Sequence, residues 1–153
     1  MKINQPIIIL KTKPKLTMTK LLLVRFYRTS SRVHMLVTPF LNEVIMGLML
    51  GDLHVEKPSV RHNARLQFKQ STINALYIAH LYSLLESFCS SPPIWLSYFD
   101  GRLNKLKTYT SLKLQTVSIP CFNIYRDSFY NNLGVKFVPA NISDSFTAVS
   151  LAY

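Results

Sequence analysis

The sequence predicts an α+β fold with the element order αββαββα, in which helices cover one face of an antiparallel sheet. Three observations support this prediction: an apolar helical stretch opens the fold, strand-like segments follow in two pairs, and an amphipathic helical stretch comes after each pair. The chain has 153 residues, of which 48% are hydrophobic. That length and composition suit one domain with a substantial core.

The first element is a helix predicted from Pro39 to about Leu50, in the segment "PFLNEVIMGLML". Thr38 can cap its N-terminus, and proline is well tolerated at the first helical position. Between Val44 and Leu50 the segment is apolar on every side, which predicts that this part of the helix is buried all round.

The end of this helix carries two glycines and then an acid. Gly47 and Gly51, four residues apart, share a face on which a second helix could approach closely. A carboxylate at a helix C-terminus meets the negative end of the helix dipole, which costs about 0.3–1 kcal/mol when exposed. A divalent cation would reverse that effect, and Mg²⁺ prefers one or two carboxylates together with waters and phosphate oxygens. Asp52 is therefore either a magnesium ligand or an ordinary residue of the turn that ends the helix.

A short strand, "LHVEK", and a longer one, "NARLQFKQS", form the predicted first strand pair. The longer segment alternates, so its apolar side chains point to one face and its polar side chains to the other. This pattern indicates a half-buried strand with a basic outer face. The outward set is Arg65, Gln67 and Lys69, and the inward set is Ala64, Leu66 and Phe68.

An amphipathic helix is predicted next, in "TINALYIAHLYSLLESFCS", with Thr72 as its cap and "SPP" as its end. The side chains that its spacing makes available to the core are Ile73, Leu76, Ile78, Leu81 and Leu85.

The second strand pair is a hairpin of "IWLSYF" and "LKTYTSLKLQTV", joined around Asp100-Gly101, a strong turn signal. The second of these strands again alternates. One face would carry Lys105, Lys107, Tyr109, Ser111, Lys113 and Gln115, and the other Leu106, Leu112 and Leu114.

The C-terminal part holds another amphipathic helix, "PCFNIYRDSFYNN", which Pro120 opens, and a turn at Gly134 follows it. The segment "VKFVPANI" reads as an extended loop, and "SDSFTAVSLAY" begins a last apolar element. The predicted sheet thus has one apolar face under the helices. Its other face is exposed and rich in side chains that donate to phosphates and base edges.

Positive charge is concentrated at the N-terminus. The chain has 18 Lys and Arg against 7 Asp and Glu, and eight basic residues but no acidic one precede Glu43. Such an excess favours a polyanionic partner, either nucleic acid or an anionic membrane surface. Residues 1–37 are predicted to be a basic leader, either an organellar transit peptide or a poorly ordered tail. Residues 38–153 are predicted to form the folded domain.

Two classes of protein are disfavoured. The apolar runs "PIIIL" and "LLLV" are far shorter than the roughly 20 residues that a membrane-spanning helix needs, so no membrane span is predicted. Cys89 and Cys121 fit no metal-binding spacing. Two thiols in a chain of this length indicate reduced cysteines in a non-secretory compartment.

Four segments in order carry a resemblance to a known family. The segment "IMGLMLGDL" resembles the signature of the LAGLIDADG homing endonucleases. The segments "NARLQFKQS", "KFVPANI" and "SFTAVSLAY" resemble parts of its organellar, intron-encoded branch. The resemblance implies an αββαββα unit with a saddle-shaped antiparallel sheet that straddles double-stranded DNA, and signature helices that pack together. It also implies a site-specific endonuclease that hydrolyses phosphodiester bonds with Mg²⁺, in a mitochondrion or another organelle.

The resemblance also implies roles for particular residues. Asp52 would be the catalytic metal ligand, Lys136 the active-site lysine, and Gln70 a polar residue that positions water. Gly47 and Gly51 would lie in the contact between signature helices. The sheet face that would read DNA carries Arg65, Gln67, Lys69, Lys105, Lys107, Lys113 and Gln115.

Two departures from the family pattern affect these expectations. The last signature position, usually a small residue, is Leu53, and the chain ends at Tyr153 where a second signature helix has only begun. One unit holds one catalytic acid, so cleavage of both strands is expected to need a homodimer or a second LAGLIDADG unit. Because the sequence resembles the double-motif branch, we expect a unit truncated before the second motif. An intron RNA maturase of the same fold, which would bind intron RNA, and an inactive remnant are the alternatives.

Overall fold

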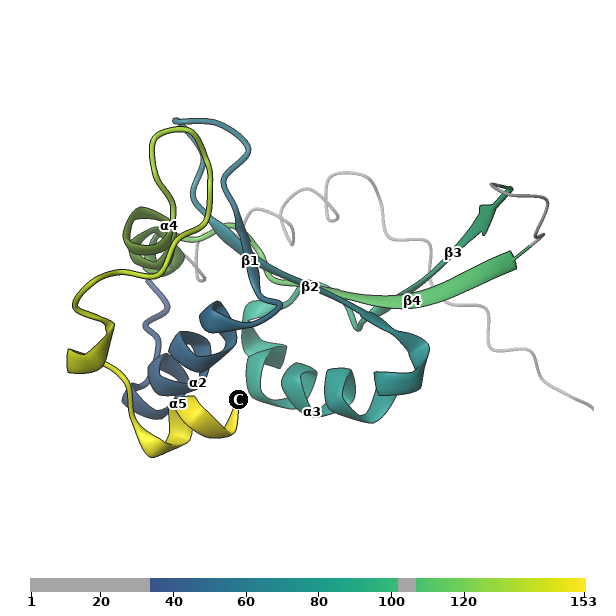
Figure 1. The fold of residues 1–153 in the computed structure, drawn as a ribbon, viewed down its shortest axis with the longest axis horizontal. Coiled ribbons are helices and arrows are strands. Elements are labelled where there is room, and N and C mark those ends of the chain that lie inside the picture. Colours follow the sequence, from purple (N-terminus) through teal and green to yellow (C-terminus); the bar gives the residue numbers. More distant parts are fainter. Residues whose placement is uncertain (1–33, 102–106) are drawn as a thin grey trace, which may run out of the picture. The chain divides into compact units, whose positions relative to one another are not determined.

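The computed structural model describes residues 34–101 and 107–153, and its element order confirms the predicted αββαββα arrangement, with a further short helix at the C-terminus (Figure 1). The elements in chain order are α2 (Pro39–Leu50), β1 (His54–Glu56), β2 (Arg65–Ser71), α3 (Ala75–Leu85), β3 (Ile94–Asp100), β4 (Lys107–Gln115), α4 (Asn123–Phe129) and α5 (Ala148–Ala152).

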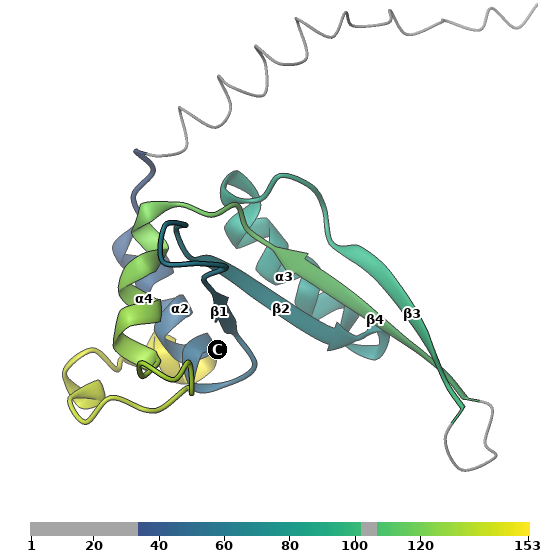
Figure 2. The same ribbon diagram turned by 90° about the horizontal axis from the view of Figure 1, so that it is seen from above.

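The four strands form one antiparallel sheet in the order β1-β2-β4-β3. The β3–β4 pairing runs from Ile94 opposite Lys113 to Asp100 opposite Lys107, which confirms the predicted hairpin. Seen from above, this hairpin extends beyond α3 (Figure 2). Lys105, which was predicted to face DNA, lies outside the described residues.

The helices α2, α3 and α5 lie on one side of the sheet, and α4 lies at its β1 end (Figure 1). The strand alternation explains this layering, because Leu66, Phe68, Leu112 and Leu114 are all buried on the helix side. The polar residues between them point to the opposite face. The aromatic side chains of Phe122, in the 3₁₀ turn that precedes α4, and of Phe129, on α4, complete the core.

The signature helix α2 begins and ends where the sequence predicted. The Thr38 hydroxyl oxygen accepts a hydrogen bond from the Leu41 N–H at 3.2 Å, and Pro39 occupies the first turn. The prediction of all-round burial is wrong at one end, because Leu50 is 41% exposed. The middle of the helix is buried against α5 and the sheet.

The start of the third helix differs from the prediction. A 3₁₀ turn, Thr72–Asn74, precedes α3, and the Ser71 hydroxyl accepts from the Ile73 N–H, so Ser71 rather than Thr72 is the cap. Ile73 lies in this 3₁₀ turn, and Leu76 lies two residues before the buried Ile78, on the opposite face of α3. Ile73 and Leu76 are consequently exposed, whereas the other predicted core residues of this helix, Ile78, Leu81 and Leu85, are buried.

The division at residue 37 into a leader and a folded domain stays a prediction, because residues 1–33 lie outside the described part of the chain. Within the described ranges, every helix is too short or too polar to cross a membrane. Cys89 is buried and Cys121 is half-buried, and within the described residues neither forms a disulfide.

Candidate functional site

The end of α2 places Asp52 on an exposed turn beside β2. The Gln70 side-chain amide donates to Asp52 Oδ2, and Asn74 Nδ2 donates to Gln70 Oε1 at 3.1 Å. Burial, and then the charge of Asp52, raise the pKa of the nearby Tyr77 phenol. Gln70 therefore contacts the Asp52 carboxylate directly, and Asn74 orients the Gln70 amide from the other side.

Lys136 lies on the other side of the same turn. Its Nζ donates to the backbone carbonyls of Gly51 and Leu53, at 2.9 Å each. Burial lowers the pKa of Lys136, while the neighbouring charge of Asp52 acts to raise it. The structure thus brings together the three predicted catalytic residues, which are up to 84 positions apart in the sequence.

A second network of contacts holds the start of β1, next to this turn, and it was not predicted from the sequence. The Tyr130 hydroxyl accepts from the Val55 N–H at 3.0 Å and lies 3.1 Å from His54 Nδ1. The Arg126 guanidinium lies 3.9 Å from the Tyr130 ring centroid and donates to the Val55 carbonyl at 2.9 Å. Burial, followed by the Arg126 charge, lowers the pKa of His54, which favours the neutral imidazole.

A Tyr130→Phe substitution is expected to destabilise the fold by about 1–2 kcal/mol, because it leaves the buried Val55 N–H without its acceptor. Thermal or denaturant unfolding of the full chain would measure this loss. Tyr82→Phe is a suitable control, since Tyr82 is half-buried on α3, away from this turn. Equal stability of Tyr130→Phe and wild type would contradict a supporting role for this hydroxyl.

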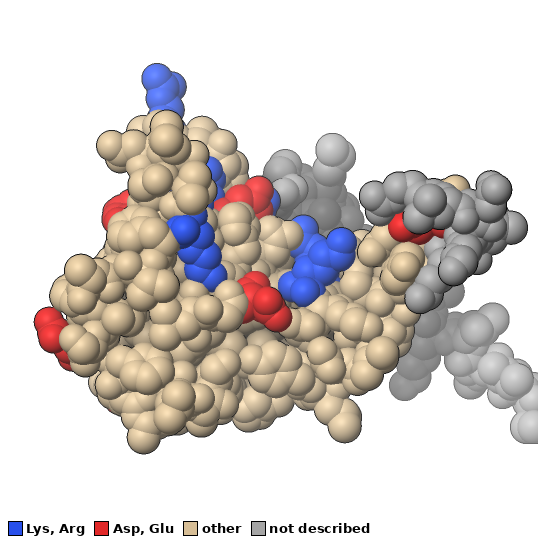
Figure 3. Space-filling view, viewed as in Figure 1, with Lys and Arg blue, Asp and Glu red and all other residues tan. Residues whose placement is uncertain are grey.

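The polar face of the sheet carries the predicted DNA-facing residues in register. Gln67 lies opposite Gln115, and Lys69 lies opposite Lys113. Lys69 Nζ lies 5.4 Å from the Tyr98 ring centroid, and the Tyr98 ring stacks on that of Tyr109. Figure 3 shows lysine and arginine side chains gathered over this face, with acidic side chains between them. The described part of β4 also places the Lys107 backbone opposite Asp100.

Arg65 is not an isolated cation on this face. Its Nε and Nη2 both lie 2.8 Å from Glu56 Oε2, on the neighbouring strand β1. In the orientation that its neighbours favour, the Gln67 amide nitrogen donates to the same oxygen at 3.2 Å, and its amide oxygen accepts from Lys113 Nζ at 2.7 Å. Glu56 was not predicted to belong to the site.

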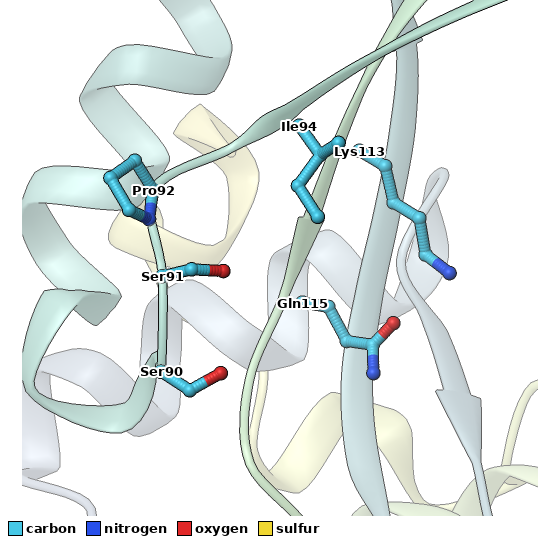
Figure 4. A pocket seen from close by; sticks show the side chains of 6 residues that line it. All are labelled: Ser90, Ser91, Pro92, Ile94, Lys113 and Gln115. Carbon is cyan, nitrogen blue, oxygen red and sulfur yellow. The ribbon is translucent and has the colours of Figure 1, made fainter.

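A pocket of about 170 Å³ borders this face at the end of β4 (Figure 4). It is lined by Ser90, Ser91, Pro92, Ile94, Lys113 and Gln115. The two serine hydroxyls point toward β4, and the side chains of Lys113 and Gln115 extend from β4 away from the serines (Figure 4). Hydroxyl, amide and ammonium groups of this kind commonly contact nucleic-acid backbones.

The two signature glycines differ in their surroundings. A Cβ on Gly47 would lie 2.1 Å from the Ser150 carbonyl oxygen, so α2 and α5 touch backbone to backbone at this position. Ser150 Oγ donates to the Glu43 carbonyl at 2.9 Å, and Thr147 Oγ1 donates to Glu43 Oε2 at 2.7 Å. A Cβ on Gly51 would meet only the Leu48 carbonyl of its own helix, at 3.7 Å.

The residues around Asp52 suit Mg²⁺ better than a metal ion that takes all of its ligands from the protein. Among the described residues, no three His, Cys, Asp or Glu side chains gather as a metal cluster. Asp52 is an exposed carboxylate at the edge of a polar face. Mg²⁺ usually keeps several waters and takes one or two carboxylates plus phosphate oxygens, so a single carboxylate is chemically sufficient here.

Comparisons with known proteins identify the family to which this chain belongs. Residues 42–153 match the model of the LAGLIDADG DNA endonuclease family. The chain is 30% identical over 116 residues to the cytochrome b mRNA maturase bI2 of Saccharomyces cerevisiae. It is 28% identical over 119 residues to the DNA endonuclease I-ChuI of Chlamydomonas applanata. These alignments cover 71% and 72% of this chain, but only 27% and 53% of the two relatives.

A solved structure shows the same fold. The homing endonuclease I-WcaI, bound to its DNA recognition sequence, superposes with a TM-score of 0.72 at 21% identity. The match covers 94% of this chain and 58% of that protein. The family match and the shared fold agree with the segment "IMGLMLGDL" at the end of α2, and the chain therefore belongs to the LAGLIDADG DNA endonuclease family.

Proposed function

We propose that this chain is one unit of a site-specific DNA endonuclease that hydrolyses phosphodiester bonds with Mg²⁺. The observation that carries the proposal is the convergence of Asp52, Gln70 and Lys136 at the edge of the polar sheet face. Family membership and the DNA endonuclease among its relatives support it.

Each side chain has a distinct part in this proposal. Asp52 would hold Mg²⁺, which when bound polarises a phosphate and lowers the pKa of a coordinated water. Gln70 fixes the carboxylate by donating to one of its oxygens. Lys136 would stabilise negative charge that develops on the phosphate. The polar side chains of β2 and β4 would bind the duplex and set its position relative to the carboxylate.

We also propose that cleavage of both strands needs a second unit, supplied by a homodimer or by a second LAGLIDADG segment. One carboxylate at one helix end can address one scissile phosphate. The helix α5 packs against α2 at Gly47, and Leu151 on α5 is 76% exposed. A second unit that packs against α5 would cover this leucine.

An intron RNA maturase is the second candidate, because one relative carries that name at 30% identity. Both activities would use the cationic surface, but only cleavage needs Asp52 and Mg²⁺. We further propose an organellar location, with the basic N-terminal residues as a targeting segment, since that relative is named for cytochrome b mRNA.

The test uses the purified full chain and a pool of DNA duplexes with a randomised centre. We expect binding to weaken steeply with salt, with a log–log slope of about −0.9 per neutralised phosphate. A selected duplex should be cut or nicked with Mg²⁺ and left intact with EDTA, as measured on a denaturing gel.

A structured group II or group I intron RNA is the comparison ligand. Tight RNA binding together with no cleavage of any selected duplex would favour the maturase. Weak binding to both ligands, without dependence on salt, would contradict a nucleic-acid function.

A further inference from the structure

Glu56 is an acidic side chain on a sheet face that we propose to contact a polyanion. It lies on β1, directly opposite Arg65 in the β1–β2 register. The Glu56 side chain is 36% exposed and that of Arg65 is 29% exposed, so both groups remain accessible on this face. A carboxylate here repels phosphate, and its position therefore needs a specific explanation.

The contacts of Glu56 point to such an explanation. Oε2 receives Arg65 Nε and Nη2 at 2.8 Å each, and the Gln67 amide nitrogen at 3.2 Å. Lys113 Nζ in turn donates to the Gln67 amide oxygen at 2.7 Å. The chain of contacts crosses three neighbouring strands, β1, β2 and β4, and it holds two long side chains in defined conformations.

Arg65 and Gln67 keep donors and acceptors that Glu56 and Lys113 do not use, and these are of the kind that hydrogen-bond to base edges. A guanidinium has five N–H donors, and Glu56 engages two groups of Arg65, which leaves donors for the O6 and N7 acceptors of guanine. The Gln67 amide has two donors and two acceptor positions, of which Glu56 and Lys113 use one each. One donor and one acceptor remain, which is what the N7 and N6 groups of adenine require.

We propose that Glu56 is a specificity-determining positioning residue, which holds Arg65 and Gln67 toward purine edges in the major groove of duplex DNA. This inference rests on the proposed DNA-binding function. The carboxylate neutralises Arg65 locally and occupies its inner donors, so phosphate competes less well for the guanidinium. Without Glu56, Arg65 can reach phosphates of any sequence, and the Gln67 amide loses one of the two partners that orient it.

The experiment compares full-length wild type with Glu56→Ala and Glu56→Gln, each used to select duplexes from a pool with a randomised centre. Wild type should select a sequence with defined purines. Glu56→Ala should lose preference at those positions and lower the ratio of selected to random-sequence affinity by about tenfold, the cost of one base contact. Its affinity for random-sequence duplex should stay equal or increase. Glu56→Gln keeps an acceptor oxygen, so it should give an intermediate ratio.

Asp127→Ala is the matched control, because it removes the same charge from an exposed position on α4. It should keep the wild-type base preferences. The melting temperature of the Glu56 variants should be close to that of wild type, since half-exposed ion pairs contribute little to stability.

Three outcomes would overturn the inference. Glu56→Ala could select the same bases at the same affinity ratio, or Asp127→Ala could relax the preferences equally, which would assign the effect to net charge. The third outcome, a wild type that selects no duplex over any other, would also overturn the DNA-binding proposal. That last result distinguishes failure of the function from failure of this residue's role.

Discussion

An Asp52→Asn variant is expected to lose about a thousandfold or more of its Mg²⁺-dependent DNA hydrolysis while keeping its affinity for DNA. The carboxylate would hold the metal ion, whose charge stabilisation is worth several kcal/mol in the transition state, and each 1.36 kcal/mol is a factor of ten in rate. Asparagine has nearly the same shape, and its amide oxygen can still accept from Gln70, so the turn should stay intact. Binding should be equal or tighter, because a negative charge beside the phosphate is removed.

The experiment measures cleavage of each strand of a selected duplex and the equilibrium affinity for that duplex, both with the same preparation of the variant. Asp144→Asn is the control, since Asp144 is another exposed carboxylate, in a 3₁₀ turn that contributes nothing to the proposed site. A hydrolysis rate of Asp52→Asn within tenfold of the wild-type rate would contradict the assignment of Asp52 as the metal ligand. If splicing assistance to an intron RNA survives the substitution, the maturase is favoured instead.

Much of the fold could be predicted from the sequence because its signals are local. The alternation of "NARLQFKQS" places Leu66 and Phe68 under the helices, and Asp100-Gly101 marks the hairpin. Thr38 and Pro39 start α2 through contacts within four residues. The gathering of Asp52, Gln70 and Lys136 was expected only through the resemblance to a family, since no local pattern connects segments so far apart.

The features that were not predicted depend on competition between similar neighbouring residues or on contacts between segments far apart in the sequence. Ser71 and Thr72 can both cap a helix, and the choice is made by the 3₁₀ turn that follows β2. Tyr130 reaches Val55 across 75 positions, so no spacing in the sequence connects them. The pairing of Glu56 with Arg65 follows from the β1–β2 register. Glu56 is an acidic residue in a chain with few acids, and this is the sequence signal that could have identified it.

A Gly47→Leu variant is expected to lose about 3 kcal/mol or more of stability, at or above the upper end of the usual cost of overpacking. The first added atom would lie 2.1 Å from the Ser150 carbonyl oxygen and 2.9 Å from its carbonyl carbon. These are backbone atoms, so no flexible side chain can move aside, and α5 must separate from α2. Separation would also break the hydrogen bonds from Ser150 and Thr147 to Glu43.

Two measurements identify how the chain responds to Gly47→Leu. A fall in melting temperature reports global destabilisation, and faster hydrogen exchange at Ser150 and Leu151 reports detachment of α5 alone. Gly51→Ala is the matched control, because its added methyl group meets only the Leu48 carbonyl at 3.7 Å, an ordinary contact. Unchanged melting and unchanged exchange in Gly47→Leu would show that α2 and α5 do not touch at Gly47. Because α2 ends at the Asp52 turn, a variant that shifts α5 should also reduce cleavage more than it reduces DNA binding.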